Sequence, residues 1–169
     1  DGGINYPGDI TKALAAGASA VMLGRLLAAT KESSGKLLLL PAKAVPRRFK
    51  SIINGAKVYR FKQYRGMGSV AAMKKGIKIS SEDEFHGKNY TNDVLIAEGV
   101  EGLIPESGSV GDLAIQLVGG VTSGMYYTGA KNIKELWQKA KFIKITQDSL
   151  NESHPHDLFI TEAGASYNL

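Results

Sequence analysis

Cysteine is missing from all 169 residues of the chain. The chain therefore supplies no disulfide, no thiolate zinc site and no thiol nucleophile of its own. Arginine is missing after Arg65. No apolar run reaches the roughly 20 residues of a membrane-spanning helix. The start, DGGINYPGD, has no charged leader followed by an apolar stretch. We therefore expect a cytoplasmic protein without a membrane partner.

Charge is unevenly distributed along the chain. The net charge is +5, yet the first 80 residues hold fifteen lysines and arginines against three acidic residues. This basic half suits an anionic partner such as a phosphate-bearing ligand, and a solvated basic surface explains it equally well. The cluster of Arg47, Arg48 and Lys50 has neither a recognition helix nor an aromatic stacking platform beside it. Nucleic acid is therefore a poor candidate partner.

The first 32 residues alternate between helical and strand-like patterns. PGDITKALAAGA predicts a helix that Asp9 caps and that Gly17 closes in the left-handed conformation. SAVMLG, at 19–24, predicts a strand buried on both faces, as in parallel sheets, and the helix-like RLLAAT follows it. DGGI at the start is typical of a loop that follows a strand. We therefore expect the β/α alternation to begin before residue 1.

Later segments are more mixed. IINGAKVYRFKQYRG predicts a β-hairpin that turns at Asn54-Gly55. Residues 77–92 are polar without a sustained period, as in a functional or mobile loop. Residues 111–130 and 132–146 both begin with a helical pattern, and the second gives way to an alternating strand, FIKIT.

Two histidines near the C-terminus raise the question of a metal site. His154 and His156 are two residues apart, which is not helical ligand spacing. With Asp157 nearby they are candidate metal ligands, and surface or hydrogen-bonding histidines are the simpler alternative.

The order of the glycine-rich motifs is more informative than any one of them. DGGI, PGDI with KALAAGA, VMLG, YRGMGS, EGVEG and ESHPHD occur in one order. In that order and spacing they resemble the C-terminal third of the IMP dehydrogenase family, apart from an insertion around 39–52. The resemblance implies an α/β fold: the C-terminal portion of a (β/α)8 TIM barrel with an appended β-hairpin, a mobile flap and a C-terminal segment. The implied parts are the last β/α units at 1–32, the insertion, hairpin and nucleotide loop at 33–69, the flap at 70–102, and the C-terminal helices and tail at 103–169.

Ligands of such barrels bind at the C-terminal ends of the strands. Gly2, Gly3 and Gly24 would offer backbone N–H groups to a phosphate there, and Arg25 a charge-assisted hydrogen bond. The resemblance implies that Asp1 binds the ribose hydroxyls of IMP and Tyr64 its phosphate. The implied substrate-binding residues are Asp1, Gly2, Gly3, Gly24, Arg25, Tyr64, Arg65, Gly66, Met67, Gly68 and Glu98, with the backbone of Met67 and Gly68 and the side chain of Glu98 at the base.

The family's reaction needs groups beyond these. A cysteine thiolate attacks C2 of the purine, NAD accepts a hydride, and water hydrolyses the covalent intermediate. That cysteine precedes DGGI in the family, so we expect it upstream of this chain. The family's flap carries an Arg-Tyr pair that activates the water, whereas the matching loop here has Asn89-Tyr90. Tyr90 and Lys88 are accordingly the candidate catalytic residues.

The resemblance also implies a cation and partners. The backbone carbonyls of Glu152, Ser153 and His154 would bind a potassium ion shared with the neighbouring subunit. The implied partners are IMP and its product XMP, the upstream half of the barrel, and further copies in a homotetramer. GMP reductase is the alternative in the same family, although Gly68 favours the dehydrogenase, and the missing flap arginine leaves open a purine-nucleotide-binding protein without activity. Tyr126 stands where the family has glycine, which brings local packing into question.

Overall fold

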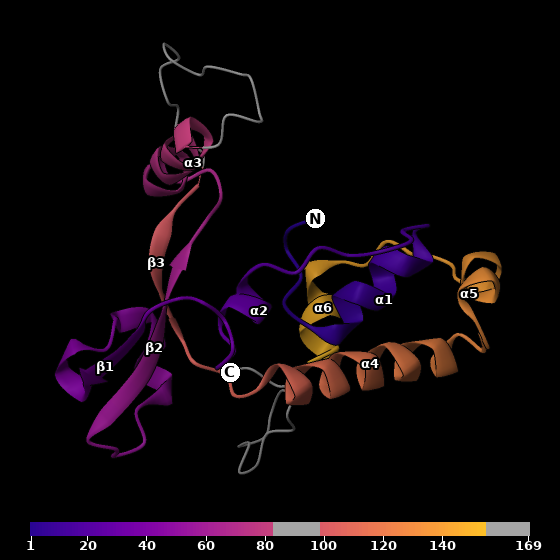
Figure 1. The fold of residues 1–169 in the computed structure, drawn as a ribbon. Helices are drawn as coiled ribbons and strands as arrows, with labels where there is room; N and C mark the ends of the chain where they lie inside the picture. The colour runs from indigo at the N-terminus through magenta and orange to yellow at the C-terminus, as the bar shows by residue number, and fades with distance from the viewer. Residues whose placement is uncertain (83–98, 155–169) are drawn as a thin grey trace. The chain divides into compact units, whose positions relative to one another are not determined.

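The computed structural model of the chain describes residues 1–82 and 99–154. Two compact units divide the chain: Asp1–Gly24 with Val110–Leu169, and Arg25–Ser109 (Figure 1). Within the described ranges, none of the helices has the length and apolar character needed to cross a membrane.

Helices build the described part of the first unit. They are α1 (Pro7–Ala15), α4 (Val110–Tyr127), α5 (Ile133–Lys139) and α6 (Gln147–Glu152). Two glycines four residues apart on α4, Gly120 and Gly124, face α1. A Cβ atom on Gly120 would overlap the side chain of Pro7, and one on Gly124 would lie 2.6 Å from Cγ2 of Thr11. The bare face of α4 therefore allows the two helices to approach closely.

α5 packs against the C-terminal end of α1. The indole Nε1 of Trp137 donates a hydrogen bond to the carbonyl of Leu14 at 2.8 Å, and Leu136 is completely buried. The side chain of Asn132 accepts a bond from the N–H of Glu135 at 2.9 Å and so caps the start of α5. These contacts hold α5 against α1.

The second unit is built on a three-stranded antiparallel sheet in the order β1-β2-β3. Its elements are α2 (Arg25–Ala28), β1 (Leu37–Pro41), η1 (Ala42–Ala44), η2 (Arg47–Ile52), β2 (Val58–Arg65), α3 (Val70–Glu82) and β3 (Glu101–Pro105). β2 is the central strand: Arg60 pairs with Leu39 of β1, and Gln63 pairs with Leu103 of β3. Figure 1 shows α3 following the end of β2.

One face of β2 carries the core of this unit. Tyr59 and Phe61 are buried with Val45. The ring of Phe49 from η2 packs on Phe61 at 5.8 Å between centroids, and Ile52 and Leu103 close the cluster. On the other face of the strand, Lys62 is also buried, with only 5% of its surface exposed.

The hairpin prediction was wrong in its first arm. Gly55 has φ +87°, so the chain does turn there. The residues before the turn, however, form the 3-10 helix η2, and the partner of β2 is β1. Phe49 and Ile52 bury their side chains against the core from this helix, and the N–H of Asn54 donates to the Tyr59 hydroxyl at 3.0 Å.

Two predicted strands do not form ladders in the described residues. SAVMLG and FIKIT both lack strand structure, because a strand needs a hydrogen-bonded neighbour and the first unit's described elements are all helices. Their apolar side chains stay exposed, Met22 at 62% and Ile143 at 82%. Residues 77–82, predicted as loop, instead continue α3.

The helix predictions were correct. α1 and α4 occupy the segments whose apolar spacing indicated them. Gly17 closes α1 with φ +104°. Asp9 lies inside the helix, where its carboxylate accepts the N–H groups of Asn5 and Tyr6, both at 3.0 Å.

Candidate nucleotide-binding site

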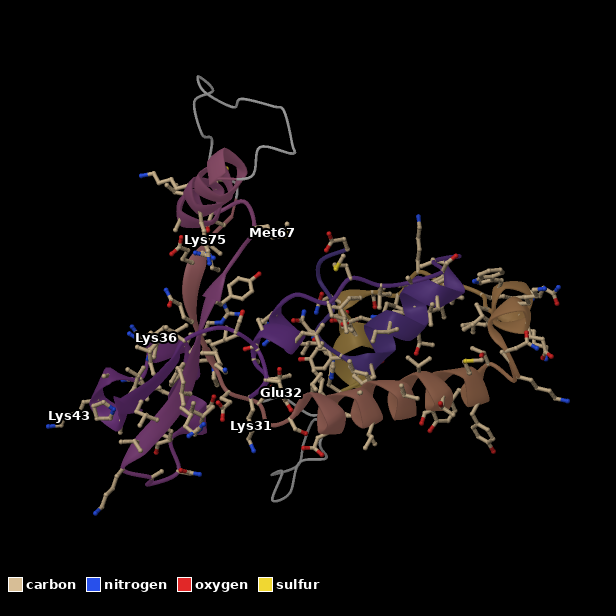
Figure 2. All side chains as sticks on the ribbon, in the orientation of Figure 1. Lys31, Glu32, Lys36, Lys43, Met67 and Lys75 are labelled. Atoms are coloured by element: carbon tan, nitrogen blue, oxygen red, sulfur yellow. The ribbon has the colours of Figure 1, made fainter. Side chains whose placement is uncertain are left out.

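The end of β2 and the tight turn after it contain five of the eleven predicted substrate-binding residues, Tyr64 to Gly68. Tyr64 is half-buried, and Arg65 is exposed opposite Glu101 of β3. The N–H of Ser69 then donates to the carbonyl of Gly66 at 3.0 Å, which closes the turn. Met67 sits at its tip and is 93% exposed (Figure 2).

The turn is joined to the segment that leads into β3. The N–H of Gly66 donates to the carbonyl of Val100, and the N–H of Gly99 donates to the carbonyl of Gly68, both at 2.9 Å. A Cβ on Gly99 would lie 2.7 Å from the carbonyl carbon of Gly68 and from the nitrogen of Ser69. Gly99 thus allows its backbone to approach that of the turn, which is a steric rather than a conformational requirement.

Ser69 connects the turn to α3. Its side chain is 2% exposed, and its hydroxyl accepts the N–H of Ala72 at 3.3 Å. Its carbonyl accepts the N–H of Met73 at 2.9 Å. Ser69 therefore caps the start of α3, and the helix follows the turn directly.

Four predicted residues belong to the first unit. Gly2 and Gly3 have φ +80° and +75°, a backbone conformation that favours glycine, and among the described residues no atom lies within 4 Å of a Cβ at either position. The carbonyl of Gly3 accepts the side-chain amide of Asn5 at 3.0 Å. Asp1 and Gly24 complete this set, whereas Arg25 starts the second unit. The structure brings Arg25 together with the Tyr64–Gly68 turn in one unit.

Asp9 holds the loop that carries these glycines. Burial disfavours ionisation of this carboxylate, but hydrogen bonds from Lys12 and from the N–H groups of Asn5 and Tyr6 outweigh that effect and lower its pKa. The Lys12 ammonium lies 2.8 Å from Oδ1 of Asp9. An ionised Asp9 therefore fixes the entry of the chain into α1, just after Gly3.

The flap candidates Lys88 and Tyr90 lie outside the described residues, as do the predicted base contact Glu98 and the pair His156 and Asp157. Glu152, Ser153 and His154 are described, at the C-terminal end of α6. Across residues 1–82 and 99–154, no three acidic, histidine or cysteine side chains gather into a metal-binding group.

Tyr126 does not crowd the described structure. It is 81% exposed on α4, and its ring meets that of Tyr127 edge-on at 6.0 Å between centroids. The packing concern raised by its position in the sequence therefore finds no support on this helix.

Two polar interactions made by side chains of β2 were missed in the sequence. Lys62 has three backbone carbonyls around its ammonium, and Glu106 accepts two bonds from Arg60. Arg60 and Lys62 both lie in one basic run, RFKQYR. The pattern of that run does not indicate that its lysine is buried rather than exposed to solvent.

A family model described as "IMP dehydrogenase / GMP reductase domain" matches residues 1–156. The chain belongs to the IMP dehydrogenase / GMP reductase family. It is 46% identical to the inosine-5'-monophosphate dehydrogenase of Methanocaldococcus jannaschii over the whole chain and 32% of that protein. It is 45% identical to that of Helicobacter pylori over 99% of the chain and 31% of that protein. The chain thus spans about a third of the length of these relatives.

A solved structure agrees with this family assignment. The chain resembles GMP reductase C318A from Trypanosoma brucei in complex with guanosine 5'-monophosphate, with TM-score 0.70 and 34% identity, over 94% of this chain and 28% of that one. The fold is accordingly a mixed α/β fragment that matches part of the barrel of IMP dehydrogenases and GMP reductases.

Proposed function

We propose that this chain supplies the nucleotide-binding loops and the flap of an IMP dehydrogenase, which oxidises IMP to XMP with NAD. The observation that carries the proposal is the Gly66–Gly68 turn, whose backbone is exposed at the tip and joined to Gly99-Val100 at its base. The relatives named above support it, since both are inosine-5'-monophosphate dehydrogenases.

The candidate residues divide the substrate among them in this proposal. Gly2 and Gly3, in their positive-φ conformation, and Gly24 present N–H groups to the phosphate, and Arg25 and Tyr64 are its side-chain ligands. Asp1 holds the ribose hydroxyls. The backbone of Met67 and Gly68 meets the purine ring, with Arg65 and Gly66 beside it and Glu98 at the base.

The chemistry then needs groups from outside the chain. NAD, when bound, would supply the hydride acceptor for oxidation at C2 of the purine. A cysteine upstream of Asp1 supplies the thiolate, since the chain has no thiol of its own. Tyr90, with Lys88 in place of the flap arginine, activates the water that hydrolyses the enzyme-bound purine.

The potassium site of this proposal lies at the end of α6, where Glu152, Ser153 and His154 follow one another. Uncharged carbonyl oxygens suit a monovalent cation of this kind. In the proposal these carbonyls hold potassium at the boundary between two subunits of a homotetramer.

The test is NADH formation from IMP by the full-length protein, followed by absorbance at the nicotinamide band. We expect turnover that depends on IMP, NAD and potassium. Tight IMP binding without turnover would instead indicate a binding protein without activity. Reduction of GMP with NADPH would favour the alternative, GMP reductase, for which the resemblance to the trypanosomal GMP reductase is the supporting observation.

A further inference from the structure

Lys62 is a buried cation enclosed by backbone carbonyls. Its Nζ donates to the carbonyls of Lys31 at 3.0 Å, Ser33 at 2.8 Å and Gly35 at 3.3 Å. The residue is 5% exposed. An ammonium has three N–H donors and no acceptor, so the three carbonyls match its charged form.

The three carbonyls belong to one loop, residues 29–36, which runs from α2 to β1. The N–H of Gln63 donates to the carbonyl of Lys36 at 2.9 Å. A Cβ on Gly35 would overlap the carbonyl oxygen of Gln63, so the loop lies directly against the backbone of β2. Lys62 is the side chain of β2 that crosses into this loop.

The same loop is tied to the segment after β3. The N–H of Lys31 donates to the carbonyl of Gly108 at 2.8 Å, and the N–H of Ser107 donates to the carbonyl of Ala29 at 2.9 Å. At its start the hydroxyl of Ser33 donates to the carbonyl of Ala28, the last residue of α2, at 2.7 Å. Hydrogen bonds therefore fix the position of the loop relative to α2 and to the sheet.

Both candidate phosphate-binding side chains of this unit depend on that loop. Side chains alternate along a strand, so Lys62 and Tyr64 share one face of β2. Arg25 begins α2, and α2 leads directly into the loop. The contacts of Lys62 thus set the distance between the helix that carries Arg25 and the face that carries Tyr64.

We propose that Lys62 is a positioning residue for the substrate phosphate: its ammonium acts as an internal cation that holds the 29–36 loop, and with it Arg25, against the Tyr64 face of β2. The inference rests on the proposed function, because it takes the phosphate of IMP as the ligand. Lys62 itself does not touch the substrate in this proposal.

The test compares IMP with inosine, which has the same base and ribose without the phosphate. Lys62→Met in the full-length protein keeps an unbranched side chain, one heavy atom shorter, and leaves three buried carbonyls without their donor. We expect the Kd of IMP, measured by calorimetry, to rise on the order of tenfold to a hundredfold, because displaced binding groups commonly cost that much. The Kd of inosine should stay unchanged, and KM for IMP should rise while kcat at saturation is retained.

Two further variants make the test specific. Lys57→Met removes an exposed lysine from the same segment and should bind IMP as the wild type does. Gly35→Ala disturbs the contact of the loop with the backbone of Gln63. It should reproduce the loss of affinity for IMP without a loss of affinity for inosine. If Lys62→Met does not fold, Gly35→Ala carries the same comparison.

The outcomes separate this inference from the function. A Lys62→Met protein that binds IMP like the wild type, or that loses IMP and inosine equally, would overturn the positioning role alone. A wild-type protein that binds neither ligand would overturn the proposed function and this inference together.

Discussion

The carboxylate of Glu106 accepts two hydrogen bonds from the guanidinium of Arg60, from Nε at 2.7 Å and from an Nη nitrogen at 3.3 Å. The carboxylate side is buried, with 5% of the Glu106 side chain exposed, whereas the Arg60 side chain is 54% exposed. Glu106 directly follows β3, and Arg60 lies on β2. The pair therefore holds the C-terminal end of β3 against β2. β3 is the strand that follows Gly99-Val100.

Acid should release this pair. The hydrogen bond from Arg60 lowers the pKa of Glu106 below its usual 4.5, against the opposing effect of burial. A carboxylate whose pKa is lower in the folded state stabilises the fold above the unfolded-state value, and this contribution disappears as the pH falls through the folded-state value. We expect wild-type full-length protein to melt at a higher temperature than Glu106→Gln at neutral pH, and the gap to close below pH 4.5.

A double-mutant cycle provides the control for that experiment. Arg60→Met should lose the same pH-dependent increment as Glu106→Gln, and the double variant should lose little more than either single variant. A gap that stays constant at pH values well below 4.5 would show that the bidentate bond is not its source.

The Gly68–Gly99 contact predicts a large effect of one methyl group. In Gly99→Ala the new Cβ would sit 2.7 Å from backbone atoms of Gly68 and Ser69, and backbone cannot move aside as a flexible side chain can. We expect a loss of about 1–3 kcal/mol in the free energy of unfolding, as for overpacking elsewhere. The KM for IMP should rise because the turn itself must shift.

Gly102→Ala is the matched control for Gly99→Ala. Gly102 lies in β3, and no described atom comes within 4 Å of its added Cβ. Its stability and KM should stay close to those of the wild type. Equal behaviour of the two variants in melting curves and steady-state kinetics would contradict the steric account of the turn.

The sequence allowed the helices to be predicted better than the strands. α1 and α4 have apolar spacing and closing or capping residues within their own segments, so local signals were sufficient. SAVMLG and FIKIT have strand-like patterns, but a ladder also needs a neighbour, and none forms with them in the described ranges. The first arm of the Asn54-Gly55 turn became η2 because Phe49 and Ile52 pack against Phe61 from a 3-10 helix.

The candidate site shows the same division. The motif order was sufficient for the family, which the comparisons confirm. The steric role of Gly99 and the carbonyl cage of Lys62 arise from segments about 30 residues apart in the chain. Such contacts are set by tertiary structure, and no local pattern in FKQYR or EGVEG indicates them.

Glycines on α4 make a second matched pair. Gly120→Ala would place a Cβ against Pro7, 2.8 Å from its Cγ, whereas no described atom comes within 4 Å of a Cβ on Gly119. We expect Gly119→Ala to stabilise the full-length protein by roughly 0.5–1 kcal/mol, because alanine is the better helix former. Gly120→Ala should destabilise it by about 1–3 kcal/mol, since α1 must move away from α4.

Substrate kinetics extend the Gly119/Gly120 comparison. Pro7 begins α1, and the loop with Gly2 and Gly3 precedes it. Displacing α1 should therefore raise the KM for IMP in Gly120→Ala and leave it unchanged in Gly119→Ala. If Gly120→Ala melts at the wild-type temperature, the close approach of α1 to α4 is not required.

The isolated 169-residue chain should not unfold cooperatively. Large apolar side chains are exposed in the first unit, among them Ile115 at 75%, Phe142 at 64% and Ile143 at 82%. Among the described residues, the edge strands β1 and β3 each have a partner strand on one side only. Calorimetry of the isolated chain should give a broad transition. A sharp two-state melt of the 169 residues alone would contradict the expectation, because it would mean that these exposed side chains need no further cover.

The native polypeptide should be larger than this chain. The chain spans only about a third of its relatives, so the polypeptide in cells should have a mass near three times 18.0 kDa. A measurement of the intact mass of the native protein checks this.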